Sequence, residues 1–328
     1  MFATERTREI PMTRRRTLFK GALLAATALA FAPAAHAETF INVLTGGTSG
    51  VYYPLGVAVS TVIGENVKDV RTSVQSTKAS VENLNLLEQG KGEVAFALAD
   101  SVKAAAEGNE EAGFRKPLEN LRAIGAIYPN VVQIVASKAS GIASLEGLKG
   151  KGLSVGAPKS GTELNARAIL AAAGMSYDDL GKVEYLPFAE SVELMKNRQI
   201  DATLQSAGLG VASIRDLASS VPIVMVPVEP ALVEKVGQPY QTTTIPADTY
   251  DGQDQPVPAA AVPNYLVTRA DLDEETVYEM TKAIFDHLDQ LVAAHGAAKG
   301  IDPAKAAKDP VIPLHPGAER YFKEKGLL

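Results

Sequence analysis

Short apolar runs alternate with amphipathic helical patterns along most of this chain, and this alternation constrains its fold more than any other feature. Phe40–Leu44 is apolar and rich in β-forming residues, and apolar residues then recur at helical spacing from Leu55 to Ile63. The same order of strand and helix recurs from Val70 to Leu98 and from Leu153 to Leu204. Such alternation is typical of α/β proteins, so we predict an α/β fold with a mostly parallel sheet.

The two series of strands and helices predict two similar lobes in tandem, with a hinge where the chain crosses between them. Apolar runs at 121–128 and 131–137 are separated by Pro129-Asn130, and the second run is interpreted as a strand that leaves the first lobe. Residues 239–263, rich in Pro, Gln, Thr and Asp, are expected to form a long irregular connection. The predicted organisation is a signal peptide at 1–37, the first part of lobe 1 at 38–130, lobe 2 at 138–255, and a return to lobe 1 at 262–328. The returning segment is expected to contain a strand, an amphipathic helix from Glu274 to Leu291, and a tail that packs on lobe 1.

The N-terminal segment predicts export. Three arginines, Arg14 to Arg16, precede an apolar run, and Ala35-His36-Ala37 has the small-x-small form that signal peptidase cuts. The run from Arg15 to Lys20 is similar to a twin-arginine signal, and an ordinary secretory signal is the alternative. We expect a mature chain that starts near Glu38, in the periplasm and outside the membrane.

Charge and cysteine content exclude several classes of function. The first 37 residues hold six basic and two acidic residues, so their removal takes the net charge from −6 to −10. An acidic chain argues against nucleic acid and anionic membranes as main partners. The sequence has no cysteine, which excludes disulfides, thiolate metal sites and a thiol nucleophile. We expect a monomer with no metal and no cofactor.

The turn from Thr45 to Pro54 links the first predicted strand to the first helix, with Pro54 expected at the first helical position and Gly64 at its end. Glycines at 46, 47 and 50 are expected to let the backbone take positive φ and approach a ligand closely, and the N–H groups of a helix start favour a negative group. An ordinary strand-to-helix turn is the plain alternative.

Polar residues follow each predicted strand, where open α/β sheets bind their ligands. Because two lobes would face each other there, we predict one interlobe cleft that closes over a ligand. The candidate ligand-binding residues are Gly46, Gly47, Thr48, Tyr52, Tyr53, Ser76, Ser80, Asn83, Ser101, Tyr128, Ser160, Gly161, Thr162, Phe188 and Ser191.

Each of these clusters also has a structural interpretation. Ser160 and Glu163 fit a capping box, and Ser101 could serve only to cap the next helix. Ser76, Ser80 and Asn83 would share one helical face, which a solvated surface would also explain. Tyr52 and Tyr53 could pack at least one ring in the core.

Searches for catalytic motifs do not support an enzyme. Val51 stands where a nucleophile elbow needs its final glycine, and Thr162 stands where a phosphate-binding loop needs lysine. The histidines after residue 37, at 287, 295 and 315, lack metal-ligand spacing. An exported serine hydrolase would need one of them beside a cleft serine.

Five segments together resemble the TAXI family, the solute-binding subunits of one class of tripartite ATP-independent periplasmic (TRAP) transporters. They span the chain in the family's order: Thr45 to Gly56, Val94 to Asp100, Ser154 to Thr162, Gln199 to Ala202 and Ile312 to Ala318.

The resemblance implies a two-lobed type II periplasmic-binding-protein fold that captures a small carboxylate, such as glutamate, glutamine or 2-oxoglutarate. It implies delivery to a permease of one small and one large membrane subunit, driven by an ion gradient. The family's binding loops map to Gly46, Gly47, Thr48, Tyr52 and Tyr53 in one lobe and to Ser160, Gly161 and Thr162 in the other. A periplasmic sensor that presents its closed form to a receptor kinase is the alternative.

Overall fold

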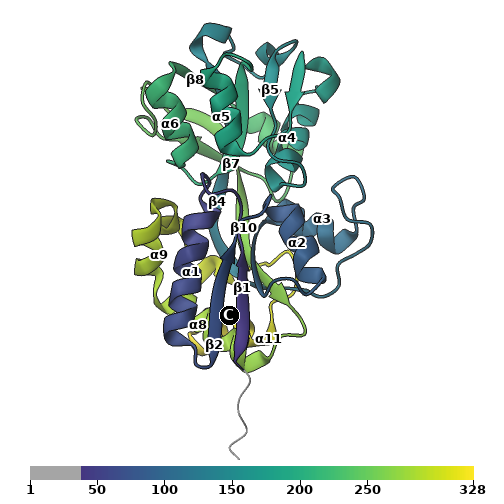
Figure 1. The fold of residues 1–328 in the computed structure, drawn as a ribbon. Coiled ribbons are helices and arrows are strands. Elements are labelled where there is room, and N and C mark those ends of the chain that lie inside the picture. Colours follow the sequence, from purple (N-terminus) through teal and green to yellow (C-terminus); the bar gives the residue numbers. More distant parts are fainter. Residues whose placement is uncertain (1–37) are drawn as a thin grey trace, which may run out of the picture. The chain divides into compact units, whose positions relative to one another are not determined.

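The computed structural model describes residues 38–328, and the predicted signal peptide at 1–37 lies outside the described residues. Thr39–Leu328 forms one compact unit. Within it, Figure 1 shows two lobes, each with helices packed on strands, joined by the long strands β4 (Leu121–Ser137) and β10 (Val257–Arg269). The fold is a two-lobed mixed α/β fold, and the predicted lobe boundaries stay a prediction.

Lobe 1 contains the first and the last elements of the described chain. Its strands are β1 (Thr39–Leu44), β2 (Val70–Gln75) and β3 (Val94–Leu98), and its helices are α1 (Tyr52–Asn66), α2 (Ser80–Glu88), α3 (Ala99–Glu107), α8 (Glu274–Asp286), α9 (Leu288–Ala294), α10 (Pro303–Ala306) and α11 (Pro316–Glu324), with the 3-10 turn η5 (Gly296–Gly300).

Lobe 2 is built from the middle of the chain. Its strands are β5 (Gly152–Ser154), β6 (Lys182–Glu184), β7 (Ala202–Ala207), β8 (Ile223–Val226) and β9 (Gln241–Ile245), its helices are α4 (Gly161–Ala172), α5 (Phe188–Lys196), α6 (Ala212–Ser220) and α7 (Pro230–Val236), and its 3-10 turns are η2 (Lys138–Ser140), η3 (Glu146–Leu148) and η4 (Tyr177–Asp179).

The strands follow the order β2-β1-β3-β10-β4-β7-β5-β6, with β8 paired to β4 and β9 to β10. The outer pairs β1–β2, β1–β3, β5–β6 and β5–β7 are parallel, whereas β10 runs antiparallel to β3, β4 and β9. β4 is also antiparallel to β7 and β8. The prediction of a mostly parallel sheet is therefore wrong at the centre, because β4 and β10 cross between the lobes in opposite directions.

The interpretation of 121–128 and 131–137 as two runs is also wrong, since β4 is one strand through Pro129-Asn130. Pro129 lies opposite Pro263 on β10, beside an irregularity in register between Pro263 and Tyr265. Proline lacks an N–H, so two prolines placed opposite each other at an irregular point disrupt the hydrogen-bond ladder least.

Three further boundaries differ from the sequence-based prediction. α1 starts at Tyr52 and continues past Gly64, where a Cβ atom would lie 3.2 Å from Thr72 Oγ1, so this glycine allows close packing on β2. The predicted irregular connection at 239–263 contains β9, which pairs with the start of β10. The predicted helix from Glu274 to Leu291 is two helices with a break at His287.

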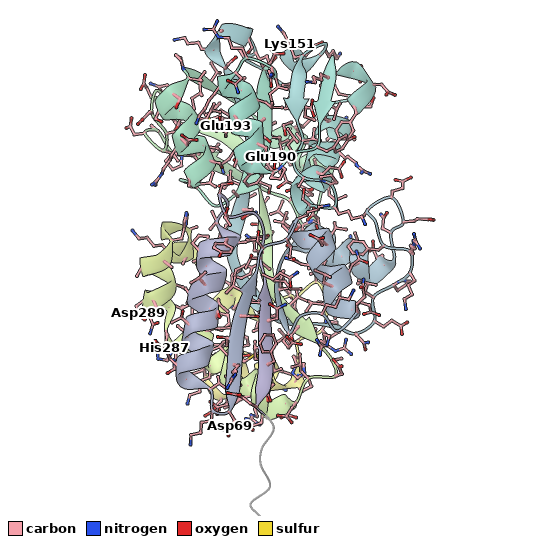
Figure 2. All side chains as sticks on the ribbon, viewed as in Figure 1. Asp69, Lys151, Glu190, Glu193, His287 and Asp289 are labelled. Carbon is pink, nitrogen blue, oxygen red and sulfur yellow. The ribbon has the colours of Figure 1, made fainter. Side chains whose placement is uncertain are left out.

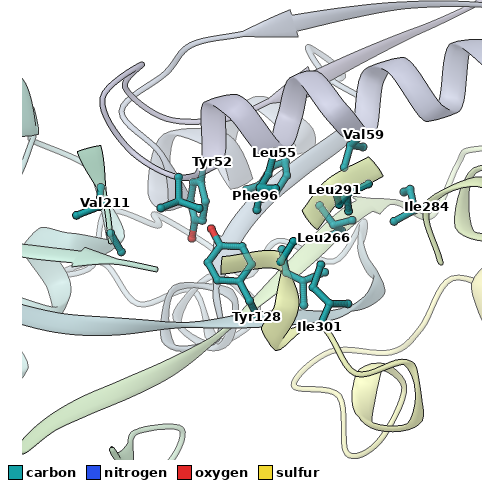
Figure 3. Close-up of a cluster of buried hydrophobic side chains, with 14 of the residues drawn as sticks. Tyr52, Leu55, Val59, Phe96, Tyr128, Val211, Leu266, Ile284, Leu291 and Ile301 are labelled. Atoms are coloured by element: carbon teal, nitrogen blue, oxygen red, sulfur yellow. The ribbon is translucent and has the colours of Figure 1, made fainter. Parts of the chain in front are cut away.

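The lobe 1 core lies between α1, the sheet and the C-terminal helices. Leu55 and Val59 of α1 are buried with Leu266 of β10 and Ile284 of α8, as Figure 3 shows. Leu314 bridges to Ala123 of β4, and α11 packs on α8, so the C-terminal tail returns to this lobe. The core thus fixes α1 on the sheet and aims its first turn at lobe 2.

Candidate ligand-binding cleft

A cavity of about 190 Å³ lies where helix starts from the two lobes meet. Its walls come from both lobes, and its floor comes from the crossing strand β4 and from β7. The lining residues are Gly46, Gly47, Ser49, Gly50, Val51, Tyr52, Ser76, Thr77, Lys78, Ala79, Ser80, Leu98, Asn130, Ala157, Ser160, Gly161, Thr162, Pro187, Phe188, Ser206 and Ala207.

The lobe 1 wall is a loop held by hydroxyl groups. The expectation of positive φ at its glycines is wrong, since none of Gly46, Gly47 and Gly50 has a positive φ. Ser76 Oγ donates to Gly46 O at 2.8 Å, and Thr77 Oγ1 donates to Thr45 O at 2.9 Å. Ala79, the N-cap residue of α2, has φ 71° and ψ −151°, a backbone conformation that residues other than glycine rarely adopt. Its N–H donates to Thr77 Oγ1. Such strain, about 1–3 kcal/mol, collects at functional sites because the surrounding contacts enforce it.

The lobe 2 wall follows β5. Gly156 has φ 97°, and a Cβ atom there would lie 2.7 Å from Thr162 Cγ2, so the turn requires glycine. Ser160 caps α4, since its Oγ accepts from Glu163 N at 3.1 Å. α5 adds Pro187 and Phe188. Ser160 is thus confirmed as a helix cap, and it also lines the cavity. The reciprocal half of the predicted capping box is not formed, because Glu163 Oε1 accepts from Arg167 Nε and Tyr177 OH instead.

The floor is a network of buried amides and phenols. Asn130 Nδ2 donates to Ser206 O at 2.8 Å, and its Oδ1 accepts from Asn264 Nδ2 at 2.8 Å. Tyr52 OH donates to Asn264 Oδ1. Burial raises the pKa of Tyr52 and of Tyr128, so both phenols stay protonated. Figure 3 shows the hydroxyl groups of these two tyrosines turned toward one another.

Two hydroxyl groups at this floor have no hydrogen-bond partner within residues 38–328. They are Tyr128 OH and Ser206 Oγ, and both side chains are buried. Ser206 also lines the cavity. A buried polar atom without a partner is costly, which points to a ligand or water at Ser206.

Four helices direct their first turns at the cavity. The N-cap residues are Val51 for α1, Ala79 for α2 and Pro187 for α5, and none of them makes a side-chain capping hydrogen bond. The N-cap of α4 is Ser160, which does make one. The first N–H groups of a helix have no partner inside it, and the helix dipole adds a partial positive charge there. Among the described lining residues no acidic side chain occurs, and the cation present is the exposed Lys78. The cavity is therefore suited to a small anion.

The lobes touch on two sides of the cavity. On one side, which we call the polar edge, Tyr240 OH and Asn165 Nδ2 of lobe 2 donate to Asp100 Oδ2 of α3 at 2.7 and 2.6 Å. Glu82 N also donates to Lys159 O at 3.1 Å. Burial raises the pKa of the Asp100 carboxyl.

On the other side, the apolar edge, Gly208 of lobe 2 packs against lobe 1. A Cβ atom at Gly208 would lie 2.6 Å from Ala297 Cβ, 3.2 Å from Tyr128 Cε2 and 3.4 Å from Val51 Cγ2. Val51 and Tyr128 share one buried cluster with Val211, labelled in Figure 3. The two lobes are therefore in contact on both sides of the cavity.

Nine of the predicted site residues come together in the lining. They are Gly46, Gly47, Tyr52, Ser76, Ser80, Ser160, Gly161, Thr162 and Phe188. Residues from four separate strand ends thus meet at one place, as the strand-end argument predicts, and their contact with a ligand stays a prediction.

Six predicted site residues lie outside the lining: Thr48, Tyr53, Asn83, Ser101, Tyr128 and Ser191. Asn83 is buried, with Nδ2 donating to Thr45 O and Phe96 O, so it fixes the loop from behind. Ser191 Oγ pairs with Ser154 Oγ at 2.7 Å. Thr48 is exposed in the turn and Tyr53 is half-buried on α1.

The lining also contains residues that the site prediction omits. They are Ser49, Gly50, Val51, Thr77, Lys78, Ala79, Leu98, Asn130, Ala157, Pro187, Ser206 and Ala207. The site prediction misses Asn130 because it separates the two apolar runs of β4 at Pro129-Asn130. Gln205 and Ser206 are among the polar residues that follow a predicted strand, but the list of predicted site residues leaves Ser206 out.

Within the described residues, no helix is both long and apolar enough to cross a bilayer. In the same part of the chain, no group of three or more His, Cys, Asp or Glu side chains could hold a metal ion. The histidines at 287, 295 and 315 do not line the cavity.

The fold matches solved structures at low sequence identity. PhnD1 from Prochlorococcus marinus (MIT 9301), in complex with methylphosphonate, matches with a TM-score of 0.57 and 14% identity over 89% of this chain and 100% of that chain. A protein from Bordetella bronchiseptica RB50 matches with a TM-score of 0.56 and 16% identity over 88% and 98%. A periplasmic transporter matches with a TM-score of 0.55 and 14% identity over 89% and 95%. A family model described as NMT1-like matches residues 43–326, and the chain belongs to the NMT1-like family.

Proposed function

We propose that this protein is an extracytoplasmic solute-binding protein that captures a small carboxylate in the cleft and delivers it to a TRAP-type permease. The observation that carries the proposal is one cavity between the lobes at which four helix starts, two from each lobe, converge. A carboxylate can accept several N–H groups at once, and each favourable charge contact at a helix start contributes about 0.3–1 kcal/mol.

Contact between the lobes on two sides of the cavity supports capture and release as the cycle. We infer that the lobes separate to admit the ligand and then close around it. β4 and β10 are the strands that continue from one lobe to the other, and small changes along them would open the cleft. A bound anion joins helix starts of both lobes and so stabilises the closed form.

The lining favours binding over catalysis. It contains hydroxyls, amides and apolar groups, but among the described lining residues no histidine or carboxylate occurs that could serve as a general base. A hydrolase that works through a serine and a histidine is therefore disfavoured at this cavity.

The resemblance of five segments to the TAXI family supports the permease partner, and the predicted signal peptide supports a periplasmic location. The expected partner is a membrane permease of a small and a large subunit, driven by an ion gradient. PhnD1 was solved with methylphosphonate, also a small anion, so phosphonates are the ligand class to compare.

A thermal-shift screen of the mature chain from Glu38 tests the ligand class. The panel contains carboxylates, methylphosphonate and methanesulfonate, followed by calorimetry of each hit. One carboxylate should raise Tm, because a ligand at 100 times its Kd adds about 2.7 kcal/mol to stability. Shifts with the phosphonate or sulfonate alone would refute the carboxylate assignment.

Thr162→Val provides the site control. Thr162 lines the cavity in the first turn of α4, so the variant should weaken binding and keep its Tm without ligand. Thr244→Val, exposed on β9 outside the lining, should bind as the wild type does. Equal affinities of the two variants would place the ligand elsewhere.

A further inference from the structure

The cleft offers nothing that could neutralise an ammonium group. Among the described lining residues, the charged side chain is Lys78, which is itself a cation. The converging helix starts add positive potential. An ammonium bound there would lose part of its hydration without gaining a carboxylate partner, which is unfavourable.

Acidic side chains on the surrounding helices are outside the lining, and three of them are already engaged. Asp100 accepts from Ser101 N, Asn165 and Tyr240. Glu163 Oε1 pairs with Arg167 Nε at 2.6 Å and accepts from Tyr177 OH at 2.9 Å.

Glu82 of α2 accepts from Lys78 N through Oε2. Glu190 of α5, labelled in Figure 2, is exposed and does not line the cavity. No acid on α2, α3, α4 or the start of α5 therefore faces the cavity among the residues described.

Ser206 adds a second requirement on the ligand. Its side chain is 4% exposed, lines the cavity, and its Oγ has no partner. Its backbone carbonyl accepts from Asn130 Nδ2, which holds this part of β7 in place. A neutral hydroxyl or oxo group on the ligand would pair with this Oγ, since a serine hydroxyl both donates and accepts.

We propose that the ligand is a small organic acid that carries a hydroxyl or oxo group and no ammonium group, with Ser206 recognising that neutral group. The inference rests on the proposed function, because it assumes that the carboxylate binds at the helix starts. It selects keto and hydroxy acids over the amino acids of the same carbon skeleton.

Calorimetry with matched acids tests the selection. One series is glutarate, 2-hydroxyglutarate, 2-oxoglutarate and glutamate, and the other is propionate, lactate, pyruvate and alanine. Within each series only one substituent changes. In the series that binds, the oxo or hydroxy acid should bind about 100-fold more tightly than the amino acid, a difference of about 2.7 kcal/mol.

Ser206→Ala tests the role of the hydroxyl. The variant should bind the oxo or hydroxy acid about tenfold more weakly, while its affinity for the unsubstituted acid stays at the wild-type value. Thr203→Val is the matched control, because Thr203 is also buried on β7 with an unpartnered hydroxyl but lies outside the lining. This control should match the wild type for every acid.

The outcomes separate this inference from the proposed function. Tighter binding of glutamate or alanine than of the matched acids would overturn the inference and leave carboxylate capture intact. Equal weakening of all acids by Ser206→Ala would also overturn it. If none of the eight acids binds, both the inference and the proposed carboxylate ligand fail.

Discussion

The polar and apolar edges of the cleft join the same two lobes by different chemistry. Along the polar edge, hydrogen bonds link Asp100 to Asn165 and Tyr240. Along the apolar edge, Gly208 packs against Val51 and Ala297. Water can replace hydrogen bonds at modest net cost, about 0.5–1.5 kcal/mol each, whereas separated apolar groups lose their burial. We infer that the polar edge opens to admit ligand while the apolar edge stays packed beside β4.

The largest expected effect comes from a side chain at Gly161 on the polar side of the cavity. A Cβ atom there would lie 2.6 Å from both Leu98 Cδ1 and Ser80 Oγ of lobe 1. Gly161→Val should hold the lobes apart and weaken ligand binding about 100-fold, about 2.7 kcal/mol by calorimetry. The fold should remain, because the clash disappears when the lobes separate.

Gly147→Ala is the control for that variant. A Cβ atom at Gly147 would meet its nearest neighbour at 3.6 Å, an ordinary contact, within η3 of lobe 2. Wild-type affinity in Gly161→Val would show that the polar edge does not need to close around the ligand.

Gly208 is the corresponding glycine of the apolar edge, and a side chain there should mainly lower the free energy of unfolding. Gly208→Ala forces a methyl group against Ala297 and Tyr128, and overpacking of this kind costs about 1–3 kcal/mol. Urea unfolding should show that loss without ligand, and ligand affinity should change less than in Gly161→Val. Unchanged stability together with lost binding would mean that the apolar edge also opens.

A smaller effect concerns pH. Burial raises the pKa of Asp100 above its ordinary value of 3.8, so the folded state holds this proton more tightly than the unfolded state does. The resulting contribution to stability is fully present below the ordinary pKa and is lost as pH rises through the raised pKa. The stability of Asp100→Asn should therefore fall less with rising pH than the stability of the wild type does.

Thermal unfolding at a series of pH values above 4 checks the difference between wild type and Asp100→Asn. Asp289→Asn, exposed on α9, should keep the wild-type profile. If the profiles of Tm against pH are parallel for the wild type and Asp100→Asn, the pKa of Asp100 is not raised in the folded protein.

Local patterns in the sequence predicted the elements and much of the cleft. Ser160 and Gly161 were found because they follow a short apolar strand and start an amphipathic helix, and both features are local. Gly46 and Tyr52 were found for the same reason. Sites at the ends of strands are accessible to this kind of argument because the sheet brings the strand ends together.

Features that depend on pairing between distant strands could not be predicted. Pro129 indicated a break, but Pro263, far along the chain, lies opposite it and lets β4 continue. Asn83 looked like a cleft residue from its spacing, yet its amide bonds to Thr45 O and Phe96 O in the neighbouring strands. The polar edge depends on Tyr240 reaching Asp100 across 140 positions, and no local pattern reports such a contact.

Amide hydrogen exchange followed by NMR, with and without the acid that gives the largest thermal shift, tests whether one bound carboxylate joins the two lobes. We expect slower exchange at the first-turn amides of α1, α2, α4 and α5 together, because one carboxylate bound in the cleft would join both lobes. Protection confined to one lobe, or lying outside these four helix starts, would contradict it.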